Sequence, residues 1–227
     1  MIQEIEIPKE VGVITLKGSV LFPQAMMPLF IFEPRYREML RDALEQDRIF
    51  AVAAADEVAM AKGVEGEPAY EVASIGIVRA CKKNEDGTAN LILQGLTRVR
   101  FESIVTEEPY RRARITQLLS EEDASPENLK SARHTVLDLI KTHRRLGAEI
   151  PREVIEFLEA VEGHESMLDL SIYALCSSAK VKQQLLETLS VTERFARFEV
   201  FLRQQLDQLK MYKKLKGDLD EEDVGDN

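Results

Sequence analysis

The segment Leu21–Leu40 reads LFPQAMMPLFIFEPRYREML and holds the signals that decide the fold. Pro34 suits the first position of a helix, because the N–H that proline lacks would have no partner there. Apolar residues follow at helical spacing and predict one stripe that packs against the rest of the domain: Tyr36, Met39, Leu40, Ala43 and Leu44. The segment therefore predicts a strand that leads directly into an amphipathic helix.

The first half of this segment is apolar throughout and interrupted by proline. We interpret 28–32 as a strand buried on both faces, within a predicted strand over 27–32. The residues before it form a proline-bounded apolar loop: Leu21, Phe22, Pro23, Met26 and Met27. Such a loop either fills the core or presents a binding surface, and paired methionines adapt well to varied partners. Both interpretations stay open at this point.

Period-two alternation and short apolar runs dominate the N-terminal half of the chain and predict strands. Besides 27–32, the predicted strands are 11–16, 49–54, 70–81, 90–94, 97–105 and 110–118. The run 82–88 separates two of them and contains Asp86-Gly87, which favours a hairpin turn.

After Leu118 the apolar period becomes helical. The predicted helices run from Ser125-Pro126 to about Leu146, from Pro151 to Gly163, from Ser166 to Cys176, from Ser178 to Leu189, and from Ser190 to about Lys216. We therefore predict an α+β protein with three parts: a β domain with one helix over 1–118, a helical bundle over 119–216, and a disordered acidic tail over 217–227.

The last predicted helix carries a capping box, because Ser190 and Glu193 stand at the required spacing. Its apolar residues follow a seven-residue seam interrupted by Gln205: Phe195, Phe198, Leu202, Leu209 and Tyr212. Such a seam packs on helices of the same chain or on a second copy. A monomer or a weak homodimer is expected.

Charge and composition exclude several classes of protein. The net charge is −10, but six of the 40 acidic residues and none of the 30 basic ones lie in 217–227, which leaves 34 acids and a charge of −4 for the rest. A chain that is this close to neutral outside its acidic end is not expected to coat nucleic acid.

Two distant cysteines, Cys81 and Cys176, form no metal or disulfide pattern. No apolar run is long enough to span a membrane, so we expect a cytoplasmic protein.

Motifs of catalysis are missing as well. The sequence contains no Gly-Lys dipeptide and therefore no P-loop, and it has neither a Gly-x-Ser-x-Gly elbow nor a His-Glu-x-x-His pair. The histidines, His134, His143 and His164, are not paired at helical spacing. We predict no catalytic residues, no metal, no cofactor and no enzymatic activity.

A basic row is the alternative candidate site. Arg98 and Arg100 alternate along one predicted strand, and Arg112 and Arg114 share a face of the next. Four guanidinium groups on adjacent strands could hold phosphates and bind RNA. This row lacks the aromatic residues that stack on single-stranded bases, so pairing with nearby acids is favoured and nucleic acid is disfavoured as a partner.

Three motifs resemble the Lon protease N-terminal, substrate-binding domain family. They are LFP at 21–23 with MPLFIFEPRY at 27–36, then GIV at 76–78 with NLILQGLTR at 90–98, and finally KQQLLETL at 182–189 with Glu193-Arg194. The resemblance extends from about Ile7 to Leu215. It implies a PUA-like β pseudo-barrel followed by a helical bundle that ends in a long helix. Phe30 departs from the pattern, since many members have histidine or another polar residue there.

In full-length Lon this domain recognises substrates and is joined to an ATPase and a Ser-Lys peptidase, and neither catalytic part has a counterpart in this sequence. The resemblance implies a stand-alone, non-catalytic module that binds exposed apolar segments of client polypeptides or acts as an adaptor in proteolysis, with a protease or chaperone as a further candidate partner. The predicted contact residues are Phe22, Met26, Met27 and Phe30. Glu33, Pro34, Arg35 and Tyr36 are assigned to structure, because helix initiation and packing account for them.

Overall fold

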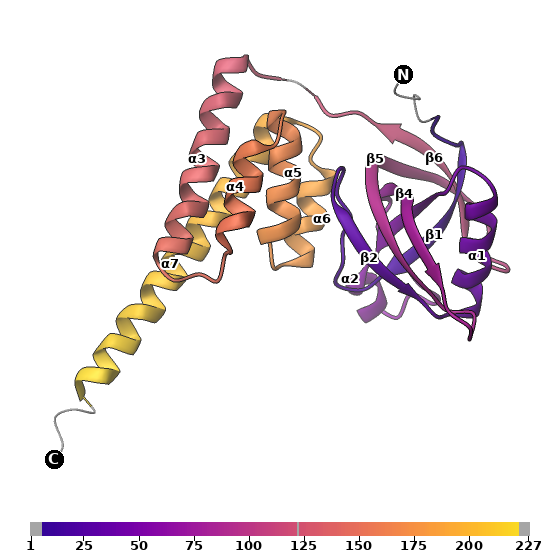
Figure 1. Ribbon diagram of the computed structural model, residues 1–227, viewed down its shortest axis with the longest axis horizontal. Helices are drawn as coiled ribbons and strands as arrows, with labels where there is room; N and C mark the ends of the chain where they lie inside the picture. Colours follow the sequence, from indigo (N-terminus) through magenta and orange to yellow (C-terminus); the bar gives the residue numbers. More distant parts are fainter. Residues whose placement is uncertain (1–5, 122, 223–227) are drawn as a thin grey trace. The chain divides into compact units, whose positions relative to one another are not determined.

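The computed structural model describes residues 6–121 and 123–222, and this part of the chain is an α+β protein with six strands and seven helices (Figure 1). It divides into two compact units. The first comprises Met1–Ser120 with Asp169–Leu189, and the second comprises Glu121–Leu168 with Ser190–Asn227. All strands belong to the first unit, which also includes residues 169–189 from the helical part of the sequence.

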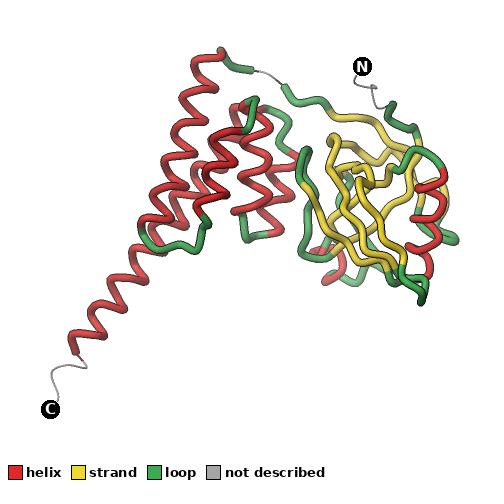
Figure 2. The backbone as a smooth tube through the Cα atoms, viewed as in Figure 1, coloured by secondary structure: helices red, strands yellow, loops and turns green. Residues whose placement is uncertain are grey.

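The strands of the first unit form one six-stranded sheet. Figure 2 shows the strands in yellow. Its strands are β1 (Glu10–Leu16), β2 (Met26–Ile31), β3 (Ile49–Ala54), β4 (Val72–Lys83), β5 (Ala89–Thr106) and β6 (Arg112–Leu118). The order is β2-β5-β4-β3-β1-β6, and an additional pairing joins β6 to β5. Five strands therefore close into a barrel, and β2 is left as an edge strand on the outside of the ring.

The long strand β5 is what allows this closure. Its first part, up to Gln94, pairs with β2, and its second part, from Arg98, pairs with β6. We predicted these parts as two strands, and the structure joins them into one. The join lies at Gly95, whose N–H donates to the carbonyl of Ala25 and whose carbonyl accepts from the N–H of Gln24, both at 2.9 Å.

Barrel closure creates a core of small and β-branched side chains that point inward from five strands. Its buried members are Val11, Val13, Ile49, Ala51, Ala53, Ala73, Ile75, Val99, Ala113 and Ile115. Helix α1 (Pro34–Glu45) adds a second layer, in which Tyr36, Met39, Leu40 and Ala43 are buried as predicted. The apolar stripe of α1 therefore accounts for its position beside the barrel.

A short helix, α2 (Glu57–Ala61), was not predicted. Its signal in the sequence is the cap: the carboxylate of Asp56 accepts hydrogen bonds from the N–H groups of Val58 and Ala59. None of its residues is buried. Apolar periodicity therefore gave no sign of this helix.

The remaining helices are α3 (Pro126–Arg145), α4 (Arg152–Ala160), α5 (His164–Leu175), α6 (Ala179–Glu187) and α7 (Val191–Glu222). The predicted caps are confirmed for three of them, because Ser125, Ser178 and Ser190 each accept a hydrogen bond from the N–H three residues on.

Helix α7 continues past the predicted end near Lys216 to Glu222, so the predicted disordered tail over 217–227 begins as helix; residues 223–227 lie outside the described part. The first part of α7 buries Phe195, Phe198 and Leu202. Tyr212 is exposed.

Substitution of Gly95 tests the close approach that joins the two parts of β5. A Cβ at this position would overlap the carbonyl oxygen of Phe22, which is backbone and cannot move aside cheaply. We expect Gly95→Ala to lower the free energy of unfolding by about 2–4 kcal/mol, in the range of severe core substitutions. Ser103→Ala, at an exposed position of the same strand, should change it by less than about 0.5 kcal/mol. Urea unfolding measures the free energy of unfolding of both variants. Equal values would contradict the close backbone approach assigned to Gly95.

Candidate functional site

The edge strand β2 has apolar side chains on both of its faces, although only one face is buried. Met27 and Ile31 point into the first unit and are buried, and Leu29 between them is partly buried. Met26, Pro28 and Phe30 point outward, and Phe32 follows on the same side, its ring stacked on that of Phe30 with centroids 5.9 Å apart. Met26, Phe30 and Phe32 are 48%, 55% and 59% exposed. We call Met26, Pro28, Phe30 and Phe32 the β2 stripe.

Beside the β2 stripe lies an open groove of about 450 Å³ over the outer face of β2, β5 and β4. Its floor follows from the strand register: Ile92 pairs with Pro28 on one side and Ala80 on the other, and Asn90 pairs with Phe30 and Lys82. The complete lining is Pro28, Leu29, Phe30, Ala80, Cys81, Lys82, Asn90, Leu91 and Ile92. This lining is mostly apolar and contains no acid.

Polar groups mark one end of the groove, where Met26 pairs with Gln94. The Nε of Arg79 donates to Oε1 of Gln94 at 2.6 Å, and Nε2 of Gln94 donates to Oε1 of Gln24 at 3.3 Å. A register shift between Val78 and Ala80 inserts Arg79 into the β4 ladder, and both Arg79 and Ala80 are exposed. Irregularities of this kind re-aim side chains at the edges of sheets.

The free edge of β2 is poorly suited to pairing with another strand. Pro28 has no N–H to donate. At one end, the hydroxyl of Tyr173 on α5 donates to the carbonyl of Met26 at 3.3 Å. Burial raises the pKa of the Tyr173 hydroxyl. The Nζ atom of Lys182 lies 5.2 Å from the centre of the Tyr173 ring, and burial lowers the pKa of Lys182. Because the edge is poorly suited to strand pairing, the side chains of the outer face are the better candidate for contact with a ligand.

The structure corrects part of the predicted contact set. Met26 and Phe30 are exposed on the groove side, whereas Phe22 and Met27 are buried in the core and do not reach the surface. The alternation of side chains along a strand explains why Met27 is buried, because Met26 points outward and its neighbour must then point inward. The interpretation of 28–32 as buried on both faces is also wrong, because the described residues leave the outer face of β2 open. Phe32 and Pro28 were missed, although the same alternation would have found them.

The alternative phosphate site does not assemble. Arg98 is 2% exposed; its Nη2 donates to Oδ1 of Asp169 at 2.7 Å and its Nε to the carbonyl of Leu186 at 3.1 Å. Arg114 and Arg112 lie 2.9 and 3.8 Å from Glu10. Arg100 is exposed. The predicted row therefore does not form as a set of four, because Arg98 is buried in an ion pair and Arg112 and Arg114 share the carboxylate of Glu10.

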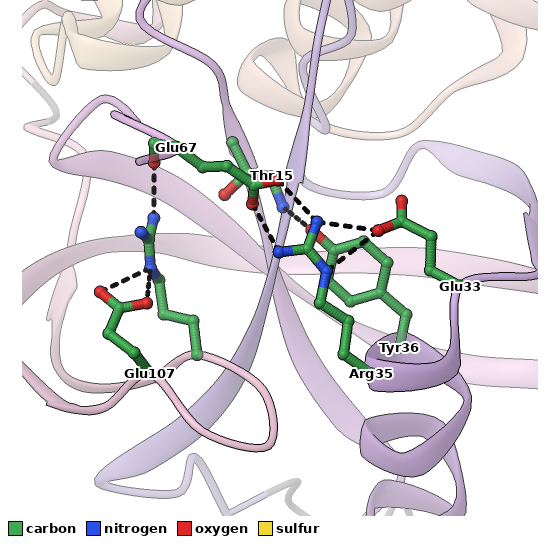
Figure 3. Close-up of polar contacts among 7 residues, drawn as sticks. Thr15, Glu33, Arg35, Tyr36, Glu67 and Glu107 are labelled. Atoms are coloured by element: carbon green, nitrogen blue, oxygen red, sulfur yellow. Dashed lines mark hydrogen bonds and ion pairs between the residues drawn. The ribbon is translucent and has the colours of Figure 1, made fainter. Parts of the chain in front are cut away.

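A second polar cluster holds the chain directly after Phe32 (Figure 3). Arg35 forms a two-pronged contact with Glu67, at 2.9 and 2.6 Å, and its Nε donates to Glu33 at 3.0 Å. The hydrogen bond from Arg35 lowers the pKa of Glu67. The N–H of Thr15 donates to the hydroxyl of Tyr36 at 3.4 Å. These contacts join the start of α1 to Glu67 and to Thr15 of β1, and the assignment of Glu33, Arg35 and Tyr36 to structure stays a prediction.

Within the described residues, no group of three or more His, Cys, Asp or Glu side chains is placed to hold a metal ion. None of the helices among these residues has both the length and the apolar character that crossing a membrane requires.

Solved structures identify the fold of this protein. The N-terminal domain of the Lon protease of the Mycobacterium avium complex matches with a TM-score of 0.66 and 19% identity, covering 86% of this chain and 97% of that one. The Lon N-terminal domain protein from Xanthomonas campestris matches with a TM-score of 0.58 and 17% identity, over 83% and 96% of the two chains. The chain thus has the fold of Lon N-terminal domains.

The family is shown by the sequence itself. Residues 10–204 match the model of the ATP-dependent protease La (LON) substrate-binding domain, and the chain belongs to this family. The Lon protease of Dictyoglomus thermophilum is 22% identical over 97% of this chain, and Lon protease 2 of Myxococcus xanthus is 26% identical over 95%. The chain spans 27% and 26% of the lengths of these two relatives.

Asp169 provides a test of the structural role assigned to Arg98. Removing one partner of a buried ion pair leaves the other charge uncompensated, so Asp169→Ala should lower the free energy of unfolding by about 3–5 kcal/mol. Glu10→Ala, which removes the half-buried partner of the exposed Arg114, should cost at most about 1 kcal/mol. Denaturant unfolding compares the two variants, and a small effect of Asp169→Ala would show that Arg98 does not depend on this pair.

Proposed function

We propose that this chain is a non-catalytic protein-binding module that captures exposed apolar segments of other polypeptides on the outer face of β2. The observation that carries the proposal is the β2 stripe itself, a row of exposed apolar side chains beside an open groove in a member of a substrate-binding family. Exposed apolar patches bordered by polar groups are typical of interaction surfaces.

The physical basis of capture is burial of apolar surface, worth about 25 cal/mol per Å². Such contacts are not directional, so a client is recognised by its exposed apolar side chains with little preference for their order. Methionine and phenylalanine suit this task, because the thioether of Met26 adapts its shape and the rings of Phe30 and Phe32 offer large, stiff contact areas. Binding of this kind is weak for one segment, because ordering a flexible client offsets much of the gain.

The support around the stripe favours a preformed surface. The Tyr173 contact at Met26 and the Arg35 cluster after Phe32 hold the two ends of the segment. A surface held in this way loses little conformational freedom when it binds. An adaptor role beside a protease would use the same surface for the client.

Substitution of the stacked phenylalanines tests this function. We expect Phe30→Ser to weaken binding of an unfolded client, such as a reduced and carboxymethylated protein, about 5- to 30-fold, because roughly 1–2 kcal/mol of apolar burial is lost. Phe157→Ser is the matched control, since Phe157 on α4 is equally exposed at 55% and lies away from the β2 stripe in sequence. Both variants should fold as stably as the parent within about 0.5 kcal/mol.

Fluorescence anisotropy with the labelled client measures the affinities. Equal loss of binding in both variants would indicate non-specific binding through any exposed apolar side chain, and not binding through the β2 stripe. No binding by the parent protein at high micromolar concentration would contradict the proposed function itself.

A further inference from the structure

A second groove in the first unit is formed by the loop between α2 and β4 and by the second part of β5. Its volume is about 340 Å³, and it shares no lining residue with the groove beside the β2 stripe. Val64, Pro68 and Ala69 line it from the loop, and Phe101 and Ile104 line it from β5. We call it the Phe101 groove.

An irregularity in β5 brings neighbouring residues of one strand to this groove. Phe101 pairs with Ile115 on β6, and the next pair joins Ser103 to Arg114. Glu102 is therefore an extra residue with no partner on β6, which makes this point of β5 a β-bulge. Bulges bend a strand and re-aim its side chains. Phe101 and Glu102 thus both line the groove, although regular alternation would place them on opposite faces.

The apolar side chains of the Phe101 groove are open to contact. Val64 is 53% and Ile104 is 46% exposed. Phe101 is partly buried, because it packs against the barrel core, as Ala69 does. A ligand that covers this apolar surface gains free energy from its burial, and the volume of the groove is in the range of small-ligand sites.

Two arginines hold the loop wall of the groove in place. Arg35 binds the carboxylate of Glu67 through two hydrogen bonds (Figure 3). Arg111, which lines the groove, donates from Nη1 to the carbonyl of Glu67 at 2.8 Å and from Nε to the carboxylate of Glu107 at 3.0 Å. The wall is therefore set before a ligand binds, which keeps the entropic cost of binding low. Both guanidinium groups are already engaged.

Three further carboxylates of the lining have no counterion. Among the described residues, the side chains of Glu65, Glu71 and Glu102 have no hydrogen-bond or ion-pair partner. Two of them adjoin Phe101. Glu71 lies opposite Phe101, whose N–H donates to its carbonyl at 2.9 Å, and Glu102 follows Phe101 along the chain. The open charge of this groove is thus negative, and a cationic ligand complements it.

An arginine side chain has both of the parts that the Phe101 groove can accommodate. Its aliphatic stem packs on apolar surface, and its planar guanidinium group pairs with carboxylates through parallel hydrogen bonds. We propose that the groove binds an arginine of a partner polypeptide. The stem lies on Phe101 and Ile104, and the guanidinium group pairs with Glu71 and Glu102. Lysine fits less well, because its ammonium group is compact and strongly hydrated.

Three alanine-rich peptides test the proposal by NMR titration of the isotope-labelled full chain. They are identical except for one central residue, which is arginine, citrulline or lysine. Citrulline keeps the stem and the planar head of arginine but is neutral, and the alanine background offers no large apolar side chain to the β2 stripe. We expect arginine to bind about 3- to 20-fold more tightly than citrulline, the gain typical of two exposed ion pairs, with lysine between them. In 1 M salt, where the screening length is about 3 Å, this preference should fall below about two-fold.

Protein variants assign the preference to the groove. The double substitution Glu71→Gln, Glu102→Gln should bring the arginine and citrulline peptides within about two-fold of each other and leave the affinity for citrulline unchanged. The matched control is Glu45→Gln, Glu85→Gln, which changes the net charge equally. Both control residues are exposed, have no side-chain partner among the described residues and do not line the groove. The control variant should keep the preference for arginine.

A third variant tests the apolar lining. Ile104→Ser should weaken binding of the arginine and citrulline peptides alike, by about 2- to 5-fold, because both stems lose the same apolar contact. Ile104 is half exposed, so the variant should remain folded. An unchanged affinity for both peptides would show that the stem does not lie on Ile104.

Three other results would overturn arginine binding in the Phe101 groove. The first is the absence of amide shifts at about 5 mM arginine peptide, or shifts centred outside the groove lining. The second is equal affinity for arginine and citrulline. The third is an equal loss of the preference in both double variants, which would indicate attraction by net charge alone. None of these results bears on the β2 stripe, whose client binding is tested separately with Phe30→Ser.

Discussion

The structure of the first unit depends on the close approach of two backbones at Gly95. The loop that contains Phe22 passes so near to β5 that only glycine fits, and Gly95 bonds to the loop through both its N–H and its carbonyl. This contact buries Leu21 and Phe22 and starts β2 in a fixed register on β5. Beyond it, β5 leaves β2 and pairs with β6, which closes the barrel. One contact therefore sets both the core and the edge strand.

The outward stripe is a consequence of this register. Once Met27 is placed in the core, alternation directs Met26, Pro28 and Phe30 to the other face, where the described residues leave them exposed. An apolar edge strand is normally a liability, since unpaired strand edges promote aggregation. Pro28 and the Tyr173 contact reduce strand pairing here. What remains is a surface suited to side-chain contacts, bordered by Lys82 and Arg79.

Sequence reasoning predicted the elements well, because strand and helix periods and serine caps are local signals. It could not predict which face of β2 would be covered, since that depends on strand order: an apolar run looks the same in a central strand and in an edge strand. Arg98 shows a second limit. Its sequence context resembles a solvated strand, but a partner 71 residues away, Asp169, makes it a buried ion pair. Non-local partners of this kind leave no signal in the spacing of residues.

Site-specific photo-crosslinking tests the central claim most directly, that the outer face of β2 is where client polypeptides bind. Benzoylphenylalanine would replace Phe30 in one sample and Phe157 in another, two positions of equal exposure. The account predicts that an unfolded client crosslinks efficiently to position 30 and only at background level to position 157. Efficient crosslinking at position 157 with none at position 30 would contradict it.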